Sequence, residues 1–174
     1  MSRIAAIALG SNLSSPWGDR AANLREAVAR VAKLGDVRGV SSFYDTKPVG
    51  TTDQPNFLNG AMLLETELEP VELMRALLAI ERAMGRDRSS LPAVASLSEA
   101  AQAGAAPIKG PRIIDLDLLL MDDVVLATPD LTLPHPAMAE RRFVLQPLAE
   151  IAPAMVDPIS GRSVAESLAR LHQT

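Results

Sequence analysis

The sequence contains no cysteine, which excludes a disulfide framework, a thiolate metal site and a cysteine nucleophile. It also lacks a long hydrophobic run near its N-terminus. The longest apolar stretch there, residues 4–9, is too short for a membrane span and lacks the flanks of a secretory signal. We therefore expect a cytoplasmic protein that does not associate with membranes.

Aromatic and basic residues are also scarce. Aromatic side chains make up 3% of the chain, so Leu, Val, Ile, Met and Ala must form most of the core. The 17 Lys and Arg residues are outnumbered by 21 Asp and Glu, and the resulting charge of −4 argues against a broad nucleic-acid footprint. Any phosphate that the protein handles must be met by local clusters of positive charge.

The 174 residues, 48% of them hydrophobic, suffice for one domain covering 1–174. Apolar spacing and turn residues predict elements in this order: a strand at 4–9, a helix at 16–34 capped by Ser15, strands at 37–44 and 56–65, a helix from residue 70 to a stop at Gly85, a strand at 112–121 and a helix at 164–172. This order favours an α+β, ferredoxin-like sandwich, in which helices pack on an antiparallel sheet and a C-terminal extension follows.

One segment departs from these patterns. Residues 89–107 are rich in alanine and serine and carry a single charge, Glu99. We interpret this segment as part of a mobile loop or an insertion at about 86–110, or as a weak helix.

Two aspartates stand two residues apart in the predicted strand 112–121. Strand alternation places Asp115 and Asp117 on one face, with their backbones roughly 6.5–7 Å apart, so that both side chains can reach one hard cation or a pair of them. The alternating aliphatic residues face the other way: Ile114, Leu116, Leu118 and Leu120. The alternative is an ordinary solvated sheet face.

Several arginines accompany this pair. Arg112 begins the same strand, Arg86 and Arg88 follow the end of a helix, and Arg141 and Arg142 lie downstream. Carboxylate-held metals together with guanidinium groups are typical of phosphoryl transfer. The chain has neither a P-loop nor the protein-kinase signature set, so the sequence supports neither of those two chemistries.

Three further residue types could bind a ligand. His135 lies between two prolines, and a structural role in this rigid turn is as compatible with the pattern as a ligand contact. Phe57 and Asn59 share a strand face and, with the distant Phe143, could hold a flat heterocycle by stacking and amide pairing. Both phenylalanines could equally be plain core residues.

These residues fall within segments that occur together in one enzyme family. The segments are Leu9-Gly10-Ser11-Asn12-Leu13, Ser41-Ser42-Phe43-Tyr44, Gln54-Pro55-Asn56-Phe57-Leu58-Asn59, Gly110-Pro111-Arg112-Ile113-Ile114-Asp115-Leu116-Asp117 and Leu133-Pro134-His135. In this order they resemble the 6-hydroxymethyl-7,8-dihydropterin pyrophosphokinases over nearly the whole chain. The resemblance implies a folate-pathway enzyme that transfers the pyrophosphoryl unit of ATP to the pterin hydroxymethyl group and releases AMP. Separately from the resemblance, we expect a monomer.

The resemblance also implies roles for individual residues. Asp115 and Asp117 would hold two Mg²⁺ ions, and with Arg86, Arg88 and Arg112 they would be catalytic. The residues implied around ATP are Glu81, Arg86, Arg88, Arg112, Leu118, Thr132, His135 and Arg141. Those implied around the pterin are Thr46, Pro48, Val49, Phe57, Asn59 and Phe143.

Some positions depart from the family pattern. Lys109 stands where an aromatic is common, Pro136 where a Tyr is often found, and Phe57 where a Tyr is frequent. A non-catalytic ferredoxin-like module that binds a nucleotide or a pterin as a regulator is therefore a second hypothesis. An RNA-binding module of the same topology is a poorer third, because the strands carry no dense aromatic and basic platform.

Overall fold

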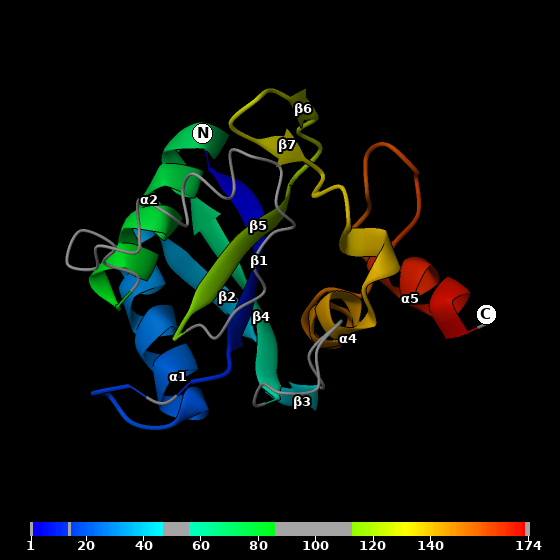
Figure 1. The fold of residues 1–174 in the computed structure, drawn as a ribbon. Coiled ribbons are helices and arrows are strands. Elements are labelled where there is room, and N and C mark those ends of the chain that lie inside the picture. The colour runs from blue at the N-terminus through cyan, green and yellow to red at the C-terminus, as the bar shows by residue number, and fades with distance from the viewer. Residues whose placement is uncertain (1, 14, 47–55, 86–112, 173–174) are drawn as a thin grey trace.

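An antiparallel sheet of five strands lies at the centre of the computed structural model, which describes residues 2–13, 15–46, 56–85 and 113–172 (Figure 1). The strands are β1 (Arg3–Ser11), β2 (Asp36–Val40), β3 (Tyr44–Thr46), β4 (Phe57–Thr66) and β5 (Asp115–Met121). Their order is β2-β4-β1-β5, and β3 pairs with the end of β4. This order is the ferredoxin-like arrangement predicted from the sequence.

Helices cover both faces of this sheet. Two of them, α1 (Arg20–Val31) and α2 (Pro70–Ala83), lie on one side, and α4 (Arg142–Ile151) and α5 (Val164–His172) lie on the other (Figure 1). Short elements complete the described chain: the 3-10 turns η1 (Ala32–Leu34) and η3 (Met138–Glu140), and the small β6 (Leu126–Ala127) and β7 (Thr132–Leu133) ribbon. The predicted C-terminal extension thus adds a third layer to the sandwich.

The two faces of the sheet have separate cores because successive strand residues point in opposite directions. On what we call the α1–α2 face, Ile7 and Leu9 of β1 pack with Leu24 of α1 and Leu73 of α2. On what we call the α4 face, the alternate residues of β1 pack with α4 and α5. The buried members of that second core include Ala6, Ala8, Ala61, Val144, Leu145, Leu148 and Val164.

The first helix starts later than its sequence pattern predicts. Residues 15–18 form a turn, in which the Ser15 and Gly18 backbones bond to each other at 2.8 and 3.0 Å. Gly18 has φ of 129°, which no helical residue adopts, so α1 begins after Asp19, whose carboxylate accepts the Ala22 N–H. The predicted Ser15 cap is therefore wrong, and α1 itself ends at Val31.

The predicted strand 37–44 is two strands, β2 and β3. Between them Ser41 bonds to Ala61 twice: the Ser41 N–H donates to the Ala61 carbonyl, and the Ser41 Oγ accepts the Ala61 N–H, both at 2.9 Å. This side-chain acceptor replaces a backbone partner and divides the ladder.

A bulge in β5 overturns part of the predicted alternation. Ile7 pairs with Leu118 and Ala6 with Leu120, so Leu119 is an extra residue on β5. Leu120 consequently belongs to the core of the α4 face rather than to that of Leu116 and Leu118. Helix α4 was also not predicted, since Pro147 within it lacks the N–H that would bond to the Phe143 carbonyl.

Candidate active site

Three neighbouring strands place a row of three residues at one end of the α4 face. Gly10 of β1 pairs with Asn59 of β4 on one side and with Asp115 of β5 on the other. All three belong to the α4 face, because the alternating Leu9 and Leu116 are buried in the opposite core. The row joins a residue expected to bind a heterocycle to one expected to bind a metal ion.

The acidic pair shares one face, as its spacing predicts. Asp115 and Asp117 are half-buried and flank Leu116, whose side chain is buried on the α1–α2 face. No group of three or more acidic or histidine side chains suited to a metal gathers within the described residues. The donor set of this pair is oxygen only, which fits Mg²⁺, an ion that usually keeps waters and takes further ligands from phosphate oxygens.

A buried carboxylate lies behind the acidic pair. Glu81 of α2 is 3% exposed, and its Oε2 accepts the Leu116 N–H at 2.7 Å. Leu116 lies between the two aspartates on β5, at the edge of the sheet. Glu81 therefore fixes the backbone that carries both predicted metal ligands. Its implied contact with ATP stays a prediction.

The Asn59 carboxamide is oriented by β3. Its Nδ2 donates a short hydrogen bond to Thr46 Oγ1, and the side chain is almost fully buried. The opposite end of the amide, Oδ1, is directed toward Gly10. Since an amide offers donors on one atom and an acceptor on the other, this contact determines which atom is available over β1.

Two aromatic residues expected to stack on a ligand come from different elements on the α4 face. Phe57 begins β4 on the same face as Asn59, and Phe143 lies in the first turn of α4. The Arg141 guanidinium carbon lies 5.8 Å from the centre of the Phe143 ring, within range of a cation–π contact. Arg141 therefore links the aromatic part of the site to the charged part.

His135 is held beside β5 by two hydrogen bonds. Its backbone N–H donates to the Leu119 carbonyl at 2.8 Å, and its ring Nδ1 accepts the Ala137 N–H at 3.2 Å. Burial, with the positive charge of Arg141, lowers the pKa of His135 below 6.5, against an opposing effect of Asp115. Because Nδ1 accepts a hydrogen bond, the neutral imidazole carries its proton on Nε2, from which it can donate to a phosphate oxygen.

Two other residues implied around ATP lie in contrasting environments. The Leu118 side chain is buried in the core of the α1–α2 face, away from the aspartates. Its N–H points to the outer edge of β5, because the N–H of Leu116, two residues earlier, does so. Any contact of Leu118 with adenine would thus come from its backbone. Thr132 is exposed on β7.

The remaining residues of the predicted site lie outside the described residues. They are Pro48, Val49, Arg86, Arg88 and Arg112. The predicted mobile loop or insertion at 86–110 also lies outside them. Among the residues described, then, the structure brings together the acidic pair, His135, Asn59 and Thr46, with Phe57 and Phe143 on the same side of the sheet.

Sequence reasoning missed a buried polar network that supports the end of β1. Asn23 of α1 is fully buried, and its Nδ2 donates to Ser11 Oγ at 3.1 Å and to the Leu13 carbonyl at 2.7 Å. Ser15 donates a short hydrogen bond to the Asn23 Oδ1. The only available signal was an asparagine among the apolar positions of a helix. The network fixes the turn that follows Gly10.

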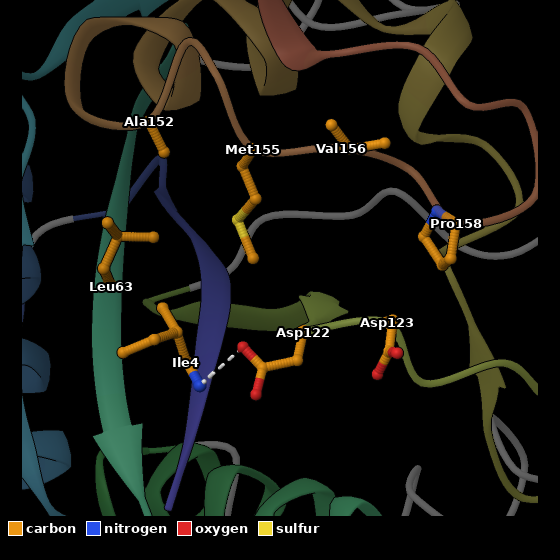
Figure 2. Close-up of a pocket in the computed structure, with 8 residues that line it drawn as sticks. All are labelled: Ile4, Leu63, Asp122, Asp123, Ala152, Met155, Val156 and Pro158. Carbon is orange, nitrogen blue, oxygen red and sulfur yellow. Dashed lines mark hydrogen bonds between the residues drawn. The ribbon is translucent and has the colours of Figure 1, made fainter.

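A hollow lies at the end of the α4 face opposite to the candidate site. It has a volume of about 440 Å³ and is lined by Ile4, Leu63, Asp122, Asp123, Ala152, Met155, Val156 and Pro158 (Figure 2). Asp122 Oδ1 accepts the Ile4 N–H at 3.1 Å. Of the two carboxylates that line the hollow, that of Asp122 is therefore already bonded to the backbone. Ile4 is six residues from Gly10 along β1, which is about 20 Å, and the hollow is separate from the site.

Comparison with solved structures identifies the fold. Two crystal structures of the Plasmodium falciparum HPPK-DHPS protein, one of the wild type with STZ-DHP and one with Pteroate, superpose with TM-scores of 0.67 and 0.69. The matches cover 99% and 98% of this chain but only 42% and 44% of the other, at 13% and 12% identity. The likeness therefore shows the fold, an α+β sandwich of the kind found in those proteins.

Sequence comparison then identifies the family. Residues 6–153 match the family described as 7,8-dihydro-6-hydroxymethylpterin-pyrophosphokinase (HPPK). The chain is 41% identical over 167 residues to a 2-amino-4-hydroxy-6-hydroxymethyldihydropteridine pyrophosphokinase of Methylorubrum extorquens, and 43% identical over 153 residues to that of Bacillus subtilis. These matches cover 95% and 87% of this chain, and 91% and 79% of the relatives.

A longer protein is also similar. The chain is 36% identical over 171 residues to the folic acid synthesis protein fol1 of Schizosaccharomyces pombe. The match covers 97% of this chain but only 20% of that protein. The chain belongs to the 7,8-dihydro-6-hydroxymethylpterin-pyrophosphokinase family. The family and the ATP-dependent pyrophosphokinase class predicted from the sequence are thereby confirmed.

No helix among the described residues is long and apolar enough to cross a membrane.

Proposed function

We propose that this chain transfers the terminal diphosphate of ATP to the hydroxymethyl group of 6-hydroxymethyl-7,8-dihydropterin, giving AMP and the pterin diphosphate. The observation that carries this proposal is the row Asn59–Gly10–Asp115. It sets an amide suited to a heterocycle and a carboxylate suited to a cation on one face of the sheet, on the two strands that flank β1. The hydroxymethyl substituent of a bound pterin would then extend toward the phosphates.

On the pterin side, recognition combines stacking with amide pairing. Phe57 and Phe143 supply the aromatic surfaces, and the carboxamide of Asn59, oriented by Thr46, pairs with the edge of the ring. Pro48 and Val49 complete this part of the proposed site. An amide that is already oriented loses little conformational entropy on binding, which favours a ring of matching donor and acceptor pattern.

On the nucleotide side, Asp115 and Asp117 would hold Mg²⁺, and we propose two ions. Bound Mg²⁺ would neutralise the phosphate oxygens and lower the pKa of the attacking hydroxyl. His135 donates from Nε2 to a phosphate oxygen, and the Arg141 guanidinium adds a charge-assisted contact. The other residues proposed around ATP are Glu81, Arg86, Arg88, Arg112, Leu118 and Thr132, with the three further arginines acting on phosphates.

In the reaction, the oxygen of the pterin hydroxymethyl group loses its proton to solvent water and attacks the β-phosphorus. The bond from that phosphorus to the oxygen bridging to the α-phosphate breaks, and AMP leaves with this oxygen. The residues contribute by holding the two substrates in line, which removes the entropic cost of their encounter from the chemical step.

The identity of the nucleotide product tests the proposal. The protein is mixed with ATP, Mg²⁺ and 6-hydroxymethyl-7,8-dihydropterin, and AMP is resolved from ADP, with a control lacking the pterin. Pterin-dependent AMP with a pyrophosphorylated pterin is the expected result. Pterin-dependent ADP would place the attack on the wrong phosphorus, and saturable binding without turnover would favour a regulatory module.

The proposal also includes an oligomeric state and a cellular location. We propose a monomer, which light scattering on the purified chain would test. We also propose a cytoplasmic location, and fractionation of cells producing the native protein would test it.

A further inference from the structure

We infer that Gly10 is a specificity-determining residue of the proposed pterin site, because its missing side chain sets the position of the Asn59 carboxamide. This inference rests on the proposed function. Gly10 is at the centre of the row Asn59–Gly10–Asp115, and neighbouring strands are about 4.8 Å apart, so the outer two backbones are separated by about 10 Å. Glycine leaves the space above the middle strand free of any side chain.

The need for glycine here is one of space. The φ of Gly10 does not lie in the left-handed region, so its backbone conformation is open to other residues. A Cβ at this position, however, would lie 3.2 Å from Asn59 Oδ1, and 3.9 Å from both the Asp115 Cβ and the Phe57 Cδ1. The first distance is tighter than ordinary contact, whereas the other two are normal van der Waals contacts.

Asn59 cannot readily yield to such a Cβ. Its Nδ2 is bonded to Thr46 Oγ1, and only 7% of the residue is exposed. Turning the carboxamide away from residue 10 would break the bond to Thr46, and keeping that bond would hold Oδ1 against the new methyl group. In the first case the amide leaves the geometry in which it pairs with a ring, and hydrogen bonds weaken steeply with misalignment. In the second case the methyl group crowds the acceptor oxygen that would face the ring.

The predicted consequence is selective. A Gly10→Ala variant is expected to bind 6-hydroxymethyl-7,8-dihydropterin about tenfold more weakly or worse, the loss that a misaligned polar pair produces. Its affinity for MgATP should stay within about twofold of wild type, because the Asp115 contact is of ordinary length. A general loosening of the fold would instead weaken both ligands.

The test is a pair of dissociation constants measured by calorimetry, one for MgATP and one for the pterin in the presence of a non-hydrolysable ATP analogue. Gly39→Ala is the matched control, since a Cβ there would lie 3.7 Å from Ile151, an ordinary contact on edge strand β2. This control should show wild-type constants. Unchanged pterin affinity in Gly10→Ala, or an equal loss for both ligands, would overturn the inference.

A second variant keeps the inference testable if Gly10→Ala does not fold. Thr46→Ala removes the anchor of the carboxamide without adding volume near β1, and it should weaken the pterin selectively. In the double variant, Gly10→Ala should cost less than in the wild type, since the carboxamide is already released. Wild-type pterin affinity in Thr46→Ala, or strict additivity, would contradict the inference. A wild-type protein that forms no pterin diphosphate would instead contradict the proposed function.

Discussion

The two faces of β1 differ in what they carry: one is core throughout, and the other combines a second core with the candidate site. Toward α1 and α2 the strand presents Ile7 and Leu9, large side chains that are almost fully buried. Toward α4 it presents Ala6, Ala8 and finally Gly10, which are all small, and the last of them, at the site, has no side chain. The large residues bury apolar area, and the small ones let α4 pack close and then leave the end of the strand open. The alternation of one strand thus supplies core residues on one face and, on the other, the open surface at Gly10 where the ligand is proposed to bind.

The two faces of the sheet are linked structurally at β5. Glu81 reaches from α2 to the Leu116 N–H, and Leu116 itself is buried with the α1–α2 core. The neighbours of Leu116 on either side, Asp115 and Asp117, point to the opposite face. The position of the acidic pair therefore depends on packing that takes place behind it.

The largest effect should come from the acidic pair. Asp115→Ala or Asp117→Ala is expected to lower the turnover by about 1,000-fold or more, because each removes a charged ligand of a cation that stabilises the transition state by several kcal/mol. The thermal midpoint should not fall, since neither residue belongs to a core. Asp123→Ala, at the far hollow, is the control and should retain full turnover. Near-normal activity in either site variant would refute the metal assignment.

Core truncations on the two faces should separate stability from binding. Leu73→Ala and Leu148→Ala each empty a fully buried position and should cost about 2–5 kcal/mol of unfolding free energy in urea. Only Leu148→Ala should also raise the KM for the pterin, because α4 carries Phe143. Equal KM changes in the two variants would show that the faces are not independent.

The link between the faces should have an intermediate effect. Glu81→Ala leaves the buried Leu116 N–H without its acceptor. It should raise the Mg²⁺ concentration needed for half-maximal activity by about 10–100-fold, as loss of a supporting contact to metal ligands does. Glu81→Gln keeps an acceptor and should recover most of that loss. Steady-state rates across a Mg²⁺ titration at fixed ATP measure both. A Glu81→Gln variant no better than Glu81→Ala would argue that the charge acts directly on ATP.

The smallest effect should come from a contact at the rim of the α4 face. Glu150 of α4 accepts the Tyr44 hydroxyl at 2.6 Å and the Ser42 N–H at 2.8 Å, and these bonds hold the pKa of Glu150 below 4.5. Its contribution to stability is therefore complete above pH 4.5 and is lost as the pH falls through its lowered folded-state pKa.

Melting temperatures between pH 7 and pH 3 test this contact. Glu150→Gln should melt slightly below wild type at pH 7, and the difference should disappear in acid. A difference that grew as the pH fell would contradict the assigned sign. Arg38 on β2, whose guanidinium bonds to Glu65 at the far end of β4 from Asn59, provides an ion pair remote from the site for comparison.

Most elements were predictable because their signals are local. The apolar run of β1, the proline and the apolar stripe that begin α2, and the alternation around Asp115 each depend on a few neighbouring residues. Helix α4 escaped prediction because its stability comes from packing across β4, and the bulge at Leu119 because it depends on pairing with β1. The start of α1 was mispredicted because the φ of Gly18 outweighed a plausible cap at Ser15.

The sequence by itself determined the family, the shared face of Asp115 and Asp117, and the ferredoxin-like order of elements. These follow from residue identity and from the fixed periods of strands and helices. Only the tertiary structure decided that Gly10 lies between Asn59 and Asp115, that Glu81 supports Leu116 from behind, and that Nδ1 of His135 accepts a hydrogen bond. Strand pairing and burial join residues far apart in the chain, and no local pattern specifies which partners they will meet.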